Sequence, residues 1–173
     1  HPFPHLSSSS LAIALSLRMG TERCFGLVPI PRNLPPYIQL EERGLRYLLT
    51  EQVVLAYADT LFENYQVEEK CVVSVTRNAD ISPEDEDYDV GEDFRAHMQK
   101  VLKKRARLAP VRLEIQGGAS PELQQYLCQR LNLTDAQVFH AKGPLNMGYV
   151  YSLENKLPQE SAATLCYPPY TPQ

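Results

Sequence analysis

The chain has 173 residues, of which 43% are hydrophobic and 22% charged, which is the composition of an ordinary globular domain with enough length for a core. Its net charge of −4 argues against a nucleic-acid-binding protein, because a phosphate backbone would select a basic face. No apolar run approaches the roughly 20 residues that a transmembrane helix needs. The first residue is His and no signal peptide is visible, so we expect a piece excised from a longer protein.

The cysteines indicate neither a zinc site nor a disulfide framework. The four of them lie far apart in the sequence, at positions 24, 71, 128 and 166. None stands in ligand spacing with another cysteine or with one of the four histidines. Cys24 and Cys71 fall in predicted strands and Cys128 on a predicted helix, where a reduced cysteine behaves as a small hydrophobic residue. A reducing, cytoplasmic compartment is therefore expected.

The first third of the chain predicts two strand pairs and a helix. LAIALSL (11–17) and RCFGLVPI (23–30) are strand-length apolar runs joined by a turn, which is typical of a hairpin. After a proline-bounded crossing, YIQL (37–40) predicts a short strand, and LRYLL (45–49) its partner. Thr50 is an N-cap candidate for an amphipathic helix that ends near residue 64.

The stretch from residue 70 to residue 107 predicts a central strand followed by a long helix. KCVVSVTR (70–77) has the alternation of a strand with a buried face. Ser82 followed by Pro83 and several acids is a pattern typical of a helix start, and this helix is expected over 84–107. VRLEI (111–115) follows as a strand, so the three elements predict a β-α-β unit, right-handed if the two strands are parallel.

The last third predicts one more helix and a short strand. Ser120 and Pro121 repeat the capping pattern before an apolar stripe of Leu123, Leu127 and Leu131. A short strand (136–141), a loop or helix start (143–148), a short final helix (148–155) and an extended tail follow. The predicted fold class is α+β with α/β-like features: a single domain whose mixed β-sheet is covered by about three main helices.

Two charged clusters flank the expected helix over 84–107. The acidic cluster could hold Mg²⁺ or Ca²⁺, but it lacks the spacing of an EF-hand loop, and acids are favoured at a helix start in any case. The basic cluster could contact phosphate groups or another polyanion, although cations are equally expected at a helix end. The acidic residues are Asp80, Glu84, Asp85, Glu86, Asp87 and Asp89, and the candidate polyanion contacts are Lys103, Lys104, Arg105 and Arg107.

No catalytic constellation is visible in the sequence. His97 and His140 have no carboxylate or nucleophile placed beside them by the sequence, as a catalytic histidine would need. Phosphate-binding loops, nucleophile elbows and zinc-protease motifs are missing. The glycine-bearing stretches 117–118 and 143–148 are read as turns rather than anion-binding nests. No catalytic, cofactor-binding or metal-binding residue is therefore predicted.

Taken in order, several stretches of the chain resemble the middle, or head, domain of the bacterial polyphosphate kinase family. The closest is a strand followed by an Arg-Asx-Ala-Asp turn and an acidic helix start. Mild departures are Asn78 in place of an expected Asp, Gly91 early in the long helix, and His140. The stretches are HPFPHLSSSSLAIAL, VPIPRNLPPYIQL, RYLLTEQVVLAYADTLFENYQV, VTRNADISPEDEDYD, VRLEI, GPLNMGYVYSL and LCYPPYTP.

The resemblance implies a parent enzyme that reversibly transfers the terminal phosphoryl group of ATP to polyphosphate, through a phosphorylated histidine and with Mg²⁺. The same resemblance implies that this histidine lies in C-terminal catalytic domains, and that these and an N-terminal helical domain are absent from residues 1–173. The head domain would then be a structural element of a cytoplasmic or membrane-associated homo-oligomer, packing other domains of the same chain. No catalytic residue of the family can be carried onto this sequence.

Three hypotheses follow. The first is a non-catalytic middle domain, inactive with ATP on its own. The alternative is a free-standing interaction module that binds polyanions through the basic end of the helix over 84–107, and the third is a small metal-dependent phosphotransferase that uses the acidic cluster.

Overall fold

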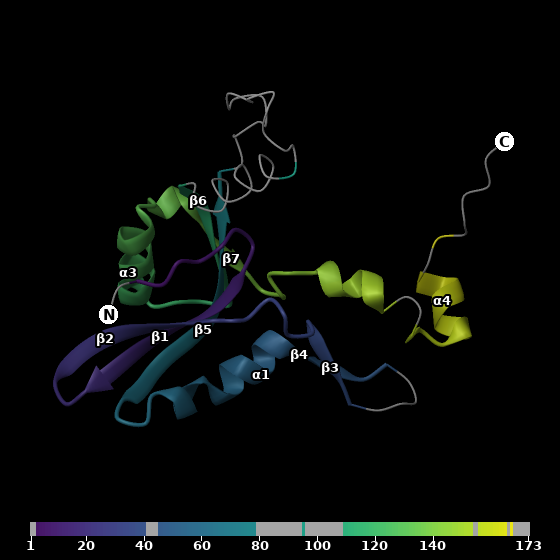
Figure 1. Cartoon of the computed structure of the whole chain (residues 1–173), viewed down its shortest axis with the longest axis horizontal. Coiled ribbons are helices and arrows are strands. Elements are labelled where there is room, and N and C mark those ends of the chain that lie inside the picture. The colour runs from purple at the N-terminus through teal and green to yellow at the C-terminus, as the bar shows by residue number, and fades with distance from the viewer. Residues whose placement is uncertain are drawn as a thin grey trace.

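The computed structural model describes residues 3–40, 45–78, 95, 109–153, 156–165 and 167. A five-stranded sheet with the strand order β2-β1-β5-β6-β7 forms its centre (Figure 1). Neighbouring strands are antiparallel except for β6 and β7, which are parallel, so the sheet is mixed. The strands are β1 (Leu11–Met19), β2 (Glu22–Pro29), β5 (Gln66–Arg77), β6 (Pro110–Gln116) and β7 (Val138–Ala141).

Strand β1 is buried on both of its faces. Successive side chains of a strand point to opposite faces, so Ala12 and Ala14 enter one core while Ile13 and Leu15 enter the other. All four are fully buried. The hairpin of β1 and β2 is confirmed, with Met19 opposite Glu22 and a two-residue turn between them. Gly20 has φ +61° in this turn, a conformation that glycine adopts without a steric cost.

One helix packs against each face of the sheet. On the first face lies α3 (Pro121–Leu131), which begins after Ser120 as predicted and buries its stripe of Leu123, Leu127 and Leu131. On the other face lie α1 (Thr50–Tyr57) and the 3-10 helix η1 (Ala58–Leu61), which buries Ala58. Phe62, just after η1, packs so closely on β2 that a Cβ at Gly26 would lie 3.0 Å from its ring.

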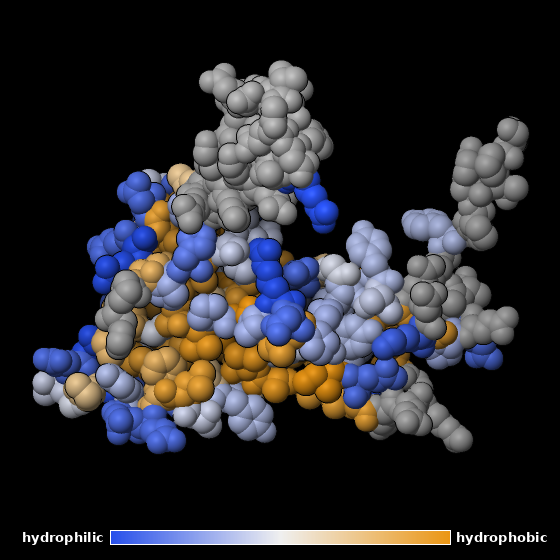
Figure 2. Space-filling model, viewed as in Figure 1, coloured by the Kyte–Doolittle hydropathy of each residue, from blue (hydrophilic) through white to orange (hydrophobic). Residues whose placement is uncertain are grey.

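A second, two-stranded sheet pairs β3 (Tyr37–Gln39) with β4 (Tyr47–Leu49), as predicted. It adjoins the start of α1, and Figure 1 shows α4 (Gln159–Leu165) standing apart from both sheets. The remaining elements are the 3-10 helices η3 (Asp135–Gln137) and η4 (Gly148–Ser152). Hydrophobic residues show at the surface over α1 and the β3–β4 hairpin, along the lower margin of Figure 2.

The prediction of one mixed sheet covered by about three main helices is wrong. Among the described residues there are two sheets, and two helices, α1 and α3, pack on the larger one. The class is α+β with few helices. The two strands of the expected β-α-β unit, β5 and β6, pair antiparallel, so the right-handed rule for parallel pairs does not apply to them. Apart from Arg95, which is helical, the helix expected over 84–107 lies outside the described residues.

Smaller differences concern helix boundaries. Thr50 is the first residue of α1 rather than its N-cap, and its hydroxyl donates to the carbonyl of Pro35 at 2.5 Å. The α-helical part ends at Tyr57, where the backbone tightens into η1. Helix α4 was not predicted. None of the helices in the described part of the chain has the length and apolar character to cross a bilayer.

Leu127→Ala should lower the free energy of unfolding by about 2–5 kcal/mol, as other leucine truncations in a core do. The reason is that Leu127 is 1% exposed between α3 and the sheet. Urea titration measures this loss, and Gln129→Ala, on the exposed side of the same helix, is the matched control. Equal effects of the two changes would contradict the packing of α3 on the sheet.

Candidate functional site

The charged clusters singled out in the sequence lie outside the described residues. This holds for the candidate polyanion contacts Lys103, Lys104, Arg105 and Arg107, for the acidic cluster from Asp80 to Asp89, and for His97. Polyanion binding by the basic cluster therefore stays a prediction. In the part of the chain that is described, no group of three His, Cys, Asp or Glu side chains could hold a metal ion.

His140 and the glycine-bearing stretches take part in local structure. His140 is exposed on β7, and its Nε2 lies 3.1 Å from the amide oxygen of Gln124. Gly117 has φ +78°, and its N–H donates to the carbonyl of Ala141, which ties the end of β6 to β7. In the stretch 143–148, the Asn146 side chain accepts from the N–H of Gly148. The turn readings of both stretches fit this geometry.

A cavity of about 480 Å³ lies where four separate segments of the chain meet. The Ser-rich entry segment, the proline-bounded crossing, the first turn of α1 and the loop before η4 each contribute to its wall. Its lining residues are Ser8, Ser9, Ser10, Leu11, Ile30, Pro31, Arg32, Leu34, Pro35, Pro36, Thr50, Glu51, Asn146 and Tyr149.

Hydrogen bonds fix the walls of this cavity. The entry segment is tied to β5, because the N–H of Ser9 donates to the carbonyl of Val75 at 2.8 Å. Arg32 in the crossing donates to the carbonyl of Ser8 at 2.5 Å. The crossing is also tied to α1, since the N–H of Thr50 donates to the carbonyl of Pro36 at 3.0 Å. The cavity is therefore formed by ordered backbone rather than by loosely placed side chains.

Glu51 is the titratable group most deeply placed in the cavity wall. The residue is only 4% exposed, and the structure shows no ion pair to its carboxylate from the described residues. Burial raises the pKa of Glu51, and only a hydrogen bond from its own backbone N–H opposes that shift. The charge of Glu51 also contributes to the raised pKa of Tyr149, after the hydrogen bond with Tyr47 and burial.

Three tyrosines join η4 to the β3–β4 hairpin beside the cavity. The ring centroids of Tyr37 and Tyr47 lie 5.5 Å apart, and that of Tyr149 lies 5.8 Å from Tyr47 and 6.3 Å from Tyr37. Lys156 lies over the Tyr37 ring at 5.0 Å. The hydrogen bonds from Ser152 and then Lys156 lower the pKa of Tyr37. This cluster holds Tyr149 in the cavity wall.

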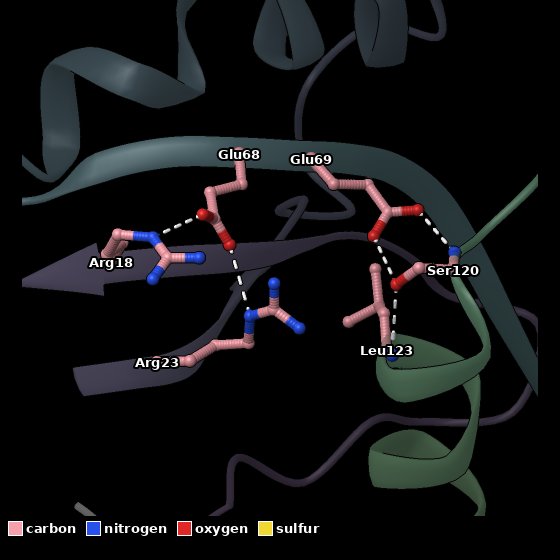
Figure 3. Close-up of polar contacts among 6 residues, drawn as sticks. All are labelled: Arg18, Arg23, Glu68, Glu69, Ser120 and Leu123. Atoms are coloured by element: carbon pink, nitrogen blue, oxygen red, sulfur yellow. Dashed lines mark hydrogen bonds and ion pairs between the residues drawn. The ribbon is translucent and has the colours of Figure 1, made fainter. Parts of the chain in front are cut away.

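A second polar cluster lies on β5, where the pairing with β1 shifts register (Figure 3). Ser16 pairs with Glu69 and Leu17 with Val67, so Glu68 is an extra residue in β5. Such a bulge re-aims side chains, and Figure 3 shows Glu68 and Glu69 pointing to the same side of the strand.

The two carboxylates of this cluster have structural partners. Glu68 accepts from Arg18 at 2.5 Å and from Arg23 at 3.1 Å, and the hydrogen bond from Arg18 is the main cause of its lowered pKa. Glu69 accepts from the N–H and the hydroxyl of Ser120, at 2.5 and 2.6 Å. The Ser120 hydroxyl in turn accepts from the N–H of Leu123 at 3.3 Å. This cluster docks α3 on the sheet.

Sequence reasoning missed both Glu51 and Glu69. Glu51 falls in the first turn of a predicted helix, where the helix dipole favours an acid in any case. Glu69 lies just before the strand predicted over 70–77. Their roles depend on a chain crossing and on a bulge, and a bulge in particular leaves no local signal in the sequence.

Glu51→Gln should gain stability relative to the unsubstituted chain as the pH rises from 4 to 7. The raised pKa means that the folded state holds the proton when the unfolded state has lost it. The cost of burying the charge is therefore absent at low pH, appears as the pH rises through the unfolded pKa, and is never incurred by Gln.

Urea titrations of both proteins at pH 4 and pH 7 test this. Glu122→Gln, at an exposed acid in the first turn of α3, is the matched control and should show a smaller change with pH. A difference between Glu51→Gln and the unsubstituted chain that is the same at both pH values would contradict the burial of the Glu51 charge.

Ser120→Ala should cost about 0.5–2 kcal/mol of stability, because it removes the hydroxyl that caps α3 and binds Glu69. Thermal or urea unfolding measures the loss, with Gln125→Ala on the exposed side of the same helix as the control. A neutral Ser120→Ala would show that the contact drawn in Figure 3 contributes nothing to stability.

A family model described as the polyphosphate kinase middle domain matches residues 1–153. The chain is 32% identical over 180 residues to a polyphosphate kinase from Pseudomonas aeruginosa, covering 99% of this chain and 25% of that protein. It is 33% identical over 162 residues to one from Exiguobacterium sibiricum, covering 90% of this chain and 22% of that protein. The chain thus spans about a quarter of the length of these curated relatives.

A solved structure shares the fold. The crystal structure of polyphosphate kinase from Porphyromonas gingivalis aligns with 98% of this chain and 23% of its own, with a TM-score of 0.59 and 18% sequence identity. At that identity the likeness concerns the fold. The family match, however, extends over 153 of the 173 residues. The chain therefore belongs to the polyphosphate kinase family and corresponds to its middle domain.

Proposed function

We propose that the chain serves as a non-catalytic middle domain within a polyphosphate kinase. The complete enzyme would transfer the terminal phosphoryl group of ATP reversibly to polyphosphate, through a phosphorylated histidine and with Mg²⁺. The middle domain would pack other domains of that enzyme and contribute to a homo-oligomer in the cytoplasm. The nucleotide, the metal and the phosphorylated histidine would then be held by other parts of the enzyme.

One observation carries this proposal: nearly the whole chain matches the middle domain, yet it spans only about a quarter of its relatives. The described polar groups support a packing role. Arg18 and Arg23 are bound to Glu68, and Glu69 caps α3 through Ser120. These side chains hold strands and helix together, as a packing role requires.

The 173-residue chain, incubated with ATP and Mg²⁺, should release no ADP and gain no acid-labile phosphate. Phosphate labelled at the γ position of ATP provides the readout, and circular dichroism confirms that the chain is folded. The polyphosphate kinase from Pseudomonas aeruginosa is the positive control.

Acid-labile phosphate on the chain would contradict the proposal. Two histidines are the positions to examine first, His97 and His140. If labelling occurred and disappeared in His140→Ala or His97→Ala, the chain would carry a phosphorylation site of its own and the packing role would be insufficient.

A further inference from the structure

We propose that the cavity at the start of α1 receives an arginine side chain from another domain of polyphosphate kinase, whose guanidinium binds the carboxylate of Glu51. This inference rests on the proposed function, because it takes the partner to be another part of the same enzyme. It assigns a binding site, a ligand group and a residue for that packing role.

The first argument is the unneutralised charge. Glu51 is 4% exposed and lines the cavity. Glu68 has two arginine partners and Glu69 has two donors on Ser120, whereas among the described residues Glu51 has only its own backbone N–H. A buried carboxylate is costly unless a cation or several donors meet it. A guanidinium entering the cavity supplies both, as charge-assisted and bidentate hydrogen bonds.

The second argument is the shape and polarity of the wall. Apart from Glu51, much of the cavity is lined by apolar side chains, among them Ile30, Pro31 and Leu34. Leu34 is 42% exposed, so the apolar wall continues to the surface. An arginine combines an apolar stem with a planar charged head, and the stem can lie along such a wall while the head reaches the carboxylate.

Neither Arg32 of the chain nor a phosphate group is a suitable partner for Glu51. Arg32 also lines the cavity, but it donates to the carbonyl of Ser8 and forms no ion pair with Glu51. The carboxylate therefore stays available to an incoming cation. A phosphate group is disfavoured in the same space, because it would meet the negative charge of Glu51.

The residues around the cavity favour a protein side chain over a small free cation as its occupant. The β3–β4 hairpin runs directly into the first turn of α1, and its cross-strand pair Ile38 and Leu48 is 43% and 46% exposed. Exposed apolar side chains near a polar anchoring pocket are typical of protein interfaces, where a buried arginine often carries much of the binding free energy.

Binding of a short peptide tests the site directly. The probe is acetyl-Leu-Arg-Leu-amide, added to the full 173-residue chain and followed by NMR. We expect saturable shifts centred on Thr50, Glu51 and Tyr149, and a fall in the pKa of the Glu51 carboxyl when the peptide is bound. The same peptide with citrulline in place of arginine should bind at least about tenfold more weakly, because it keeps the shape and loses the charge.

Two variants complete the test. Glu51→Gln should weaken the arginine peptide by about tenfold or more, whereas Glu122→Gln, at an exposed acid elsewhere, should leave its affinity unchanged. If Glu51→Gln did not fold, the comparison of arginine and citrulline peptides on the unsubstituted chain would still decide. Equal binding of the two peptides, or no localised shift at about 10 mM peptide, would overturn the proposal.

The outcome is separate from that of the ATP experiment. A chain that is inert with ATP and ignores the peptide contradicts only the Glu51 site. A chain that turns over ATP contradicts the non-catalytic role, whatever the peptide does.

Discussion

The rest of the structure depends on the burial of β1 between β2 and β5. Its alternating side chains supply both cores, with small residues such as Ala12 and Ala14 under α3 and large ones such as Ile13 and Leu15 under α1. In the described part of the chain, one helix on each face of the sheet is enough to bury both faces of this central strand.

The bulge in β5 attaches the β1–β2 hairpin and α3 to the sheet. One extra residue turns Glu68 and Glu69 to the same side, where the first binds Arg18 and Arg23 of the β1–β2 hairpin and the second caps α3. On the opposite side of the sheet, the entry segment, the crossing and α1 close around Glu51. Glu68 is thus neutralised by two arginines and Glu69 is bound by Ser120, whereas Glu51 has no ion pair from the described residues.

Much of the fold could be predicted because the signals are local. Strand-length apolar runs around a turn predicted β1 and β2, alternation predicted β5, and the pattern of Ser120, Pro121 and the leucine stripe predicted α3. What failed depends on distant contacts. The antiparallel pairing of β5 with β6 cannot be read from either strand, and the early end of α1 follows from packing of Ala58 and Phe62 on the sheet. Glu51 was missed because a first-turn acid is favourable in any exposed helix, and its burial depends on segments that are distant in the sequence, among them the crossing at Pro35 and Pro36.

As a middle domain, the chain is proposed to support catalysis by packing against the remainder of a polyphosphate kinase. The most direct measurement replaces the matching segment of the Pseudomonas aeruginosa enzyme with this chain and assays kinase activity of the chimera. The account predicts that a folded chimera retains activity, that deleting the segment abolishes it, and that substitutions of His140 leave it unchanged. A folded chimera without activity, or one whose activity is lost with His140, would contradict the claim.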